Sequence, residues 1–329
     1  MKTIWKGFQG PLAEEITGFL THKRALGRKY LVEERSLRLL DRFLVERGIR
    51  TIETITAQLI EDFLVSRPRK SPRGYNHLLG VVRRLLDWLV EQGVLDRSPL
   101  TARPRRQTRQ RIPYLFDSAQ AKKLLEIAGN LPSNPAAPLR GPTYRTIFAL
   151  LYGLGLRVGE VSRLCPKDVD FNRDLLIIRM TKFSKSRLVP FGPRMANLLR
   201  EYIRLREERW GTLDQEWPLF SFNKDRPINP ATTSVAFQHV VSMLNIEVPP
   251  GVSHPHLHDL RHSFAVGTLL RWYRNGIDPS ARLLHLSTLL GHVNPTSTAV
   301  YLTITEDLLK EGNRRFEDFA MPVLKEVRR

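Results

Sequence analysis

The chain has 329 residues, of which 42% are hydrophobic and 26% charged, the composition of a globular protein long enough for two domains with separate cores. Its 52 lysines and arginines against 33 acidic residues leave a net charge of +19, which favours nucleic acid as a partner over a basic protein with no polyanion to bind. A single cysteine argues against disulfides and fits a reducing cytoplasm, while the lack of a long apolar run argues against a membrane span. The first twenty residues have acids where a secretory leader has its apolar centre, so we expect no such leader.

Residues 1–100 predict a compact domain of four helices and no strands. Apolar residues recur at helical spacing from Pro11 to about Gly93, most clearly in the fourth helix, whose stripe has offsets of four, three and four: Leu78, Val82, Leu85 and Leu89. Basic residues with few acids nearby lie along the edges of this domain. They favour a DNA-facing surface over a helical bundle with no binding role. These residues are Lys23, Arg24, Arg28, Lys29, Arg67, Arg69, Lys70, Arg83 and Arg84.

Residues 101–113 predict a basic linker between two domains. The stretch 98–113 reads SPLTARPRRQTRQRIP, with three prolines, no acid and no apolar periodicity, so we expect no packed element there. Its arginines are Arg103, Arg105, Arg106, Arg109 and Arg111. An extended strap that follows a phosphate backbone and a flexible tether both fit this composition, and charge alone does not separate them.

Residues 114–329 predict a second domain that mixes helices with a small sheet. Ser118 has the side chain of an N-cap for a helix that ends at Gly129, and a long helix follows. Arg157 begins the next short helix between two apolar residues, so we expect it to be partly buried. A buried guanidinium needs an anionic partner, for which Glu160 is a candidate.

Short β-prone segments come next and predict a small antiparallel sheet: 168–171, 174–180 and 188–190. Lys182 and Lys185 lie on the hairpin tip between the last two segments, a position where a lysine is ordinarily solvated. Further helices are expected over 195–208 and 230–244. The polar-rich segment 305–329 is expected to dock on its own domain or on a neighbouring subunit.

The stretch 253–302 holds the densest set of polar residues suited to chemistry. His258 and Arg261 are three positions apart, so they share a helix face and converge on one spot. A guanidinium binds two phosphate oxygens and an imidazole moves a proton, so the pair suits a phosphate. Tyr301, nine positions after His292, is a candidate nucleophile because its phenolate can form a covalent ester.

More histidines adjoin the first of these motifs: His254, His256 and His262. The spacing of the cluster is that of a strand followed by a helix, and no cysteine or well-placed carboxylate completes a ligand set. We therefore expect no metal site in this stretch.

In one order along the chain, LGLRVGEVSRL, a lysine on a hairpin, HDLRHSFA and LLGHVNPTSTAVY resemble the boxes of the tyrosine recombinase (phage integrase) family, which includes the Xer-type resolvases. The resemblance covers essentially the whole chain, and the conjunction of boxes makes it specific. It implies a multidomain, mainly α protein. A four-helix, SAM-like core-binding domain over 1–100 and a basic linker over 101–113 would precede a mixed α+β catalytic domain with a small antiparallel sheet over 114–329.

The resemblance also implies roles for particular side chains: Arg157, Lys182, His258, Arg261, His292 and Tyr301. The arginines would hold the non-bridging oxygens of the scissile phosphate, and the tyrosine would attack it, giving a 3′-phosphotyrosine and a free 5′-hydroxyl. Lys182 would protonate the leaving oxygen, His258 would assist proton transfer, and His292 would bind the phosphate. TKFSKSR replaces both glycines of the family's GKGxKxR pattern, so the choice between Lys182 and Lys185 stays open.

The leading interpretation is a site-specific recombinase that cuts and rejoins double-stranded DNA with paired binding sites through a Holliday junction. It would act as a homo-tetramer, without metal, ATP or another cofactor, in the cytoplasm and associated with the nucleoid. A helper recombinase stays open, as does the role in integration, transposition, excision or resolution of DNA elements. Two alternatives are a catalytically silent DNA-binding accessory protein of this fold and a type IB topoisomerase-like enzyme that relaxes supercoils.

Overall fold

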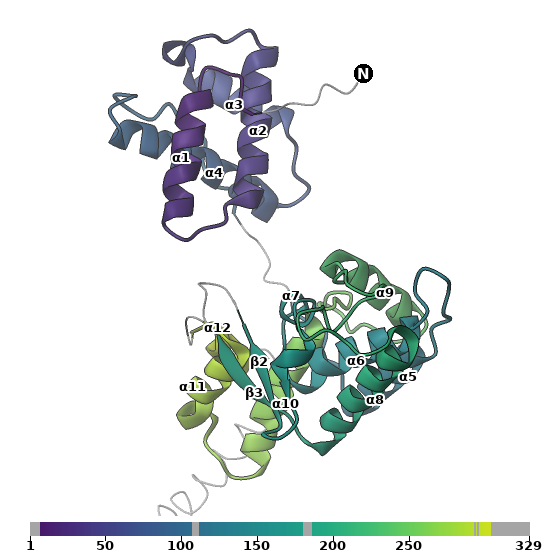
Figure 1. The fold of residues 1–329 in the computed structure, drawn as a ribbon. Helices are drawn as coiled ribbons and strands as arrows, with labels where there is room; N and C mark the ends of the chain where they lie inside the picture. Colours follow the sequence, from purple (N-terminus) through teal and green to yellow (C-terminus); the bar gives the residue numbers. More distant parts are fainter. Residues whose placement is uncertain (1–6, 107–111, 180–185, 293, 295, 304–329) are drawn as a thin grey trace, which may run out of the picture. The chain divides into compact units, whose positions relative to one another are not determined.

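A computed structural model of the chain describes residues 7–106, 112–179, 186–292, 294 and 296–303. The chain forms two compact units, Met1–Gln110 and Arg111–Arg329 (Figure 1). Each unit has its own hydrophobic core. Within the described ranges, no helix has the length and apolar character needed to cross a membrane.

The first unit is a bundle of helices around a core of leucine, isoleucine and phenylalanine. Its elements are α1 (Ala13–Ala25), α2 (Leu31–Glu46), the 3₁₀ turn η1 (Ile52–Thr54), α3 (Ala57–Ser66) and α4 (Pro72–Glu91). In α4, the Ser71 hydroxyl accepts a hydrogen bond from the Gly74 amide and Pro72 occupies the first helical position, two strong signals for a helix start. The predicted stripe of α4 is buried throughout, which confirms that helical periodicity located this core.

The second unit is built mainly of helices. They are α5 (Ser118–Gly129), α6 (Arg140–Gly153), α7 (Val158–Val161), the 3₁₀ turn η2 (Pro166–Asp168), α8 (Pro193–Trp210), α9 (Pro230–Ser242), α10 (Asp259–Arg274), α11 (Pro279–Leu290), α12 (Thr296–Ala299) and the 3₁₀ turn η4 (Val300–Thr303). The strands β1 (Val169–Asp170), β2 (Leu175–Ile178) and β3 (Arg187–Pro190) form one antiparallel sheet in the order β1-β2-β3.

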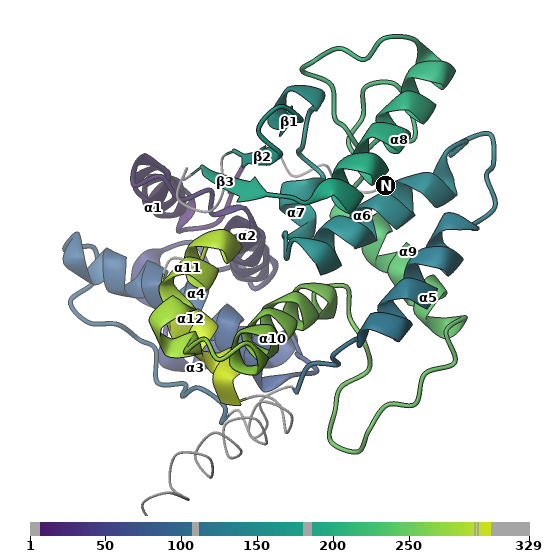
Figure 2. The ribbon, with the colours of Figure 1, turned by 90° about the horizontal axis from the view of Figure 1, so that it is seen from below.

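Helix α6 is the centre of this unit, with α5, α8 and α10 packed against it. Helices α10, α11 and α12 gather at one side, where β3 also contacts α11 (Figure 2). The ends of these elements bring the residues of the next section together, although α7 and η4 are far apart in the sequence.

Several predicted bounds differ from the structure by one to two residues, and two of the local differences have a clear physical reason. The N-cap of α5 is Asp117, not Ser118: the Asp117 carboxylate accepts from the Gln120 amide at 2.8 Å, and the Gln120 side chain accepts from the Asp117 amide at 3.2 Å. This reciprocal capping box satisfies two amides at once, which a lone serine hydroxyl cannot do. The strand expected over 174–180 begins later, because Asp174 adopts a left-handed φ of 52° in the preceding turn.

Candidate active site

Glu160 on α7 is the centre of a buried network of charges. Its carboxylate accepts from Arg157 Nη1 at 2.8 Å and from the Arg157 amide at 2.9 Å. Arg187 on β3 binds the same carboxylate with both terminal nitrogens, at 2.9 and 2.8 Å. Burial by itself would raise the pKa of Glu160, but the hydrogen bonds and charges of Arg187 and Arg157 lower it to about 2. Glu160 is therefore an anion that orders two arginines.

The C-terminus of α11 holds three arginines through three consecutive backbone carbonyls. Arg187 Nε donates to Leu289 O at 2.8 Å, Arg261 Nη2 to Leu290 O at 2.6 Å, and Arg157 Nη2 to Gly291 O at 2.8 Å. The last carbonyls of a helix lack partners within the helix and carry the negative end of its dipole, so cations are favourable there. The helix end thereby fixes the positions of these guanidinium groups.

Two glycines make this arrangement possible. Gly291 has a φ of 66°, and a Cβ on it would lie 2.8 Å from Arg187 Nη1. Gly155 has a φ of 64°, its carbonyl accepts from Arg261 Nη1 at 2.6 Å, and a Cβ on it would lie 2.3 Å from Phe264. Both positions need the left-handed conformation and the missing side chain of glycine.

Arg261, in the first turn of α10, is 1% exposed. Burial and the nearby charge of Arg157 lower its pKa to about 9, so it remains a cation at neutral pH. Its Nε is buried and meets no acceptor in the described part of the chain. A buried cation with an unused N–H favours the entry of an anion.

Tyr301 lies in η4 with only 4% of its surface exposed. Its hydroxyl oxygen is 2.9 Å from His262 Nδ1. Burial raises the pKa of the Tyr301 hydroxyl, and the charges of Arg261 and Arg157 only partly oppose this increase. The hydroxyl is therefore protonated in this state and needs a proton acceptor before it can act as a nucleophile.

His292 follows α11 and faces the ring of Tyr301, with the two ring planes 21° apart and their centroids 6.3 Å apart. Its Nδ1 lies 2.7 Å from Thr298 Oγ1. Burial, followed by the charges of Arg261 and Arg157, lowers the pKa of His292 to about 4. At neutral pH the imidazole is thus uncharged, and it serves the site as a hydrogen-bonding group rather than as a cation.

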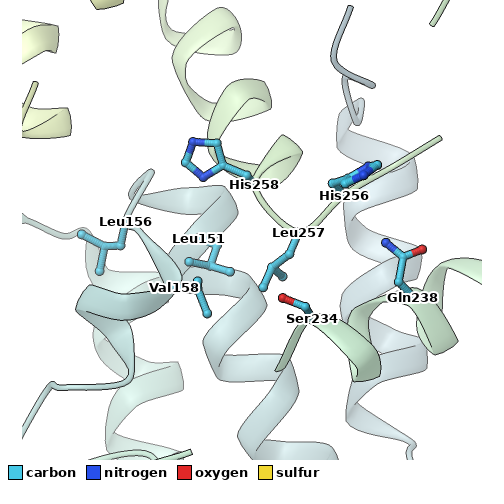
Figure 3. A pocket seen from close by; sticks show the side chains of 8 residues that line it. All are labelled: Leu151, Leu156, Val158, Ser234, Gln238, His256, Leu257 and His258. Carbon is cyan, nitrogen blue, oxygen red and sulfur yellow. The ribbon is translucent and has the colours of Figure 1, made fainter. Parts of the chain in front are cut away.

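His258 is the N-cap of α10 and stands over a pocket of about 260 Å³ (Figure 3). The pocket is lined by Leu151, Leu156, Val158, Ser234, Gln238, His256, Leu257 and His258. The His258 ring also meets the His262 ring edge to face, with centroids 4.7 Å apart. The imidazole of His258 therefore lies between this largely apolar pocket and His262, which contacts Tyr301.

No group of three or more metal-ligating side chains among the described residues has the geometry of an ion site.

The structure brings most of the expected catalytic residues together. The charges of Arg261, Arg157 and His258 all act on His292, and those of the two arginines act on Tyr301. Lys182 and Lys185 lie outside the described residues, as does the segment 304–329. The catalytic residues expected from the sequence and described here thus share one neighbourhood.

Sequence reasoning missed two members of the site. Arg187 shares a strand face with buried Val189, so the period-two alternation of β3 was a usable signal that it faces inward. His262 follows His258 by four positions, which places both on one helix face, but only the fold brings Tyr301 to it.

The basic residues of the first unit are partly engaged within the unit. Arg24 forms an ion pair with Glu34, so the expectation that few acids lie near the cluster is wrong at this point. Lys23 lies over the Phe19 ring, with its Nζ 5.2 Å from the ring centroid, and Arg83 donates to Ala102 O at 3.4 Å.

The first half of the linker is fastened to α4. Asn76 accepts from the Arg105 amide at 2.7 Å and donates to the Arg105 carbonyl at 2.8 Å. The Arg105 guanidinium lies over the Tyr75 ring, 4.0 Å from its centroid. For residues 101–106 these contacts favour a fixed strap over a flexible tether, while Arg109 and Arg111 lie outside the described residues.

Comparisons with known proteins agree with this picture. The profile of the Phage integrase family matches residues 115–307. The chain is 32% identical over 309 residues to the integrase/recombinase y4rB of Sinorhizobium fredii, covering 92% of this chain and 96% of the relative. It is 30% identical over 303 residues to the tyrosine recombinase XerC of Yersinia pestis, covering 89% of this chain and 91% of the relative.

The fold is also similar to that of a solved integrase. The Tn1549 transposon integrase in complex with a circular intermediate DNA matches with a TM-score of 0.65 over 93% of this chain and 100% of that chain. The two sequences are only 16% identical, so this likeness concerns the fold.

Proposed function

Because the chain belongs to the phage integrase family and is a tyrosine site-specific recombinase, we propose that it exchanges strands between two DNA duplexes with Tyr301 as the nucleophile. One observation carries the proposal. The hydroxyl of a buried tyrosine lies within the electrostatic reach of two arginines, the buried Arg261 and the partly exposed Arg157, and Arg261 has an unused N–H. Phosphoryl transfer needs mainly positioning and positive charge around the phosphate oxygens, which this arrangement supplies.

Each side chain then has a defined part in the reaction. Arg157 and Arg261 hold the non-bridging oxygens of the scissile phosphate, and neutral His292 donates a hydrogen bond to it. When His292 Nδ1 accepts the Thr298 hydroxyl hydrogen, Nε2 carries the ring proton and serves as this donor. His258 assists proton transfer at the phosphate.

The cleavage step exchanges one ester for another. The Tyr301 oxygen forms a bond to phosphorus as the bond from phosphorus to the 5′-oxygen breaks, leaving a 3′-phosphotyrosine and a 5′-hydroxyl. Lys182, or Lys185 in its place, gives the leaving oxygen its proton. Because bond energy is roughly conserved, a new 5′-hydroxyl reverses the step without ATP.

We assign the exchange to a homo-tetramer on DNA with paired binding sites, passing through a Holliday junction, in the cytoplasm and on the nucleoid. The stretch from Leu308 to Leu324 is our candidate for the element that links neighbouring subunits. Integration, transposition, excision and resolution all use this chemistry. Strand exchange by an assembly that includes a helper recombinase uses it as well.

The test is covalent trapping on nicked duplexes tiled across the DNA that flanks the gene. The wild-type protein should give a detergent-resistant adduct, and Tyr301→Phe should give none while binding DNA within a few-fold of wild type, because only the nucleophilic oxygen is lost. An adduct in the Tyr301→Phe variant would refute the assignment of the nucleophile. Binding by the wild type without an adduct would favour the accessory protein, and relaxation of supercoils without exchange would favour the topoisomerase.

A further inference from the structure

The hydroxyl of Tyr301 has a direct partner outside the six side chains assigned above. His262 on α10 places Nδ1 2.9 Å from this oxygen, and the two rings have centroids 5.4 Å apart and planes inclined by 58°. Tyr301 is almost fully buried, so bulk water has little access to its hydroxyl. Any proton that leaves the phenol must therefore pass to a group already in contact with it.

The surroundings make a proton acceptor necessary. A phenol attacks phosphorus as the phenolate, and burial holds the pKa of Tyr301 above its ordinary value despite the neighbouring arginines. The arginines stabilise negative charge on the oxygen, but they already carry their full complement of protons and accept none. An imidazole accepts a proton near neutral pH and is the commonest group for this task in enzymes.

We infer that His262 is the proton acceptor of Tyr301 during cleavage, and the proton donor to the same oxygen during ligation. This inference rests on the proposed function and adds a residue to it. In cleavage the Tyr301 O–H bond breaks, the proton moves to His262 Nδ1, and the freed electron pair forms the bond to phosphorus. The 5′-oxygen leaves with a proton from the lysine, so each oxygen exchanges its proton with a separate residue.

The titratable and charged groups around the His262–Tyr301 pair come from several elements. His258 and Arg261 belong to the same helix end as His262, Arg157 is the N-cap of α7, and His292 follows α11. His258 and His262 meet edge to face, and on η4 the Tyr301 hydroxyl contacts the His262 ring.

His262→Asn separates proton transfer from positioning. The asparagine amide is attached to the same carbon position as Nδ1 and keeps a hydrogen bond to the phenol, but it takes up no proton at neutral pH. We expect single-turnover cleavage of a nicked suicide duplex to fall by about 10²- to 10⁴-fold at neutral pH. The rate should then keep rising with pH towards ionisation of the phenol, whereas the wild-type rate levels off once its base is unprotonated.

His262→Ala adds a rescue experiment, because free imidazole can enter the space left by the side chain. Imidazole should restore cleavage in His262→Ala in proportion to the unprotonated fraction of the added imidazole. It should not restore cleavage in His262→Asn, whose side chain fills this space. His285→Asn on the exposed face of α11 is the matched control and should cleave as the wild type does. DNA binding, measured for every variant, identifies any that fails to fold.

The outcomes are distinct. An adduct from the wild type together with a His262→Asn variant of unchanged rate and pH profile overturns the inference alone. A slow His262→Asn with the wild-type pH profile, and no imidazole rescue of His262→Ala, also overturns it, because both results indicate a purely structural role. Absence of any adduct from the wild type overturns the proposed function and the inference with it.

Discussion

At the scale of single residues, one buried carboxylate determines where two guanidinium groups lie. The Glu160 side chain is 3% exposed, while those of Arg157 and Arg187 are 33% and 9% exposed. Removing one partner from such a network leaves the remaining buried charges without compensation, which is costly. Glu160 thus fixes the positions of the Arg157 and Arg187 guanidinium groups.

Glu160→Gln should reduce stability in a pH-dependent way. The folded-state pKa of about 2 lies below the unfolded value of 4.5, so the charge contributes stability fully above about pH 4.5 and loses it as the pH falls towards 2. The pH-dependent part amounts to roughly 3 kcal/mol at most. Urea midpoints of the full chain should therefore differ most between variant and wild type at neutral pH and converge in acid.

Glu126→Gln is the control for this comparison. Glu126 is 59% exposed, and its Oε1 forms only a long surface contact with Lys122 Nζ, at 3.9 Å. Its midpoint should follow that of the wild type at every pH. A gap between Glu160→Gln and wild type that stays constant from neutral pH to acid would contradict the proposed state of the carboxylate.

The same network separates what sequence predicts from what it does not. Glu160 was a predictable partner of Arg157, because three positions and a short helix suffice to bring them together. Arg187 joins from 27 positions away and Tyr301 reaches His262 from 39 positions away. No local pattern specifies such contacts, since they depend on how α10, α11 and β3 pack.

At the scale of elements, periodicity predicted the helices of the first unit well and the strands of the second less well. The stripe of α4 runs from Leu78 to Leu89, about three turns, and is long enough to be unambiguous. The strands are short, and their ends depend on turns such as the one at Asp174. Charge alone did not show whether the linker is a fixed strap or a flexible tether, because residues 101–106 are held by a polar side chain of α4, Asn76.

Asn76→Ala should release the strap. The Arg105 amide donates to Asn76 Oδ1, so its hydrogen exchange is slow in the wild type and should become about ten-fold faster in the variant. Asn76→Asp keeps the acceptor and should retain most of the protection. Fast exchange of this amide in the wild type would show that the strap is not held.

At the scale of the whole molecule, the net charge of +19 is the feature that most generally indicates the binding of a polyanion such as DNA. Two units joined by a basic strap present cations over a long stretch of chain, and each phosphate contact releases counterions from DNA. Arg103 and Arg106 on the strap are exposed. Arg105 is already stacked on Tyr75, so its two neighbours are the better probes.

In a Tyr301→Phe background, the double variant Arg103→Ala and Arg106→Ala should bind DNA with a weaker dependence on salt. Each lost phosphate contact lowers the slope of log affinity against log salt by about 0.9, so the expected change is about 1.8. Arg204→Ala is the control, since Arg204 on α8 is exposed and paired with Glu208. A slope equal to that of the parent would mean that the strap does not follow the phosphate backbone.

The three consecutive carbonyls at the end of α11 set a rule for building hybrid enzymes. A junction placed between Arg261 and Leu289 would take Arg157, Arg187 and Arg261 from one parent. Their three carbonyl acceptors at the end of α11 would come from the other parent. In such a hybrid, the guanidinium donors and their backbone acceptors come from different parents. A junction near residue 110, where the two units divide, keeps every member of the network within one parent, so exchanging the first unit whole leaves the network intact.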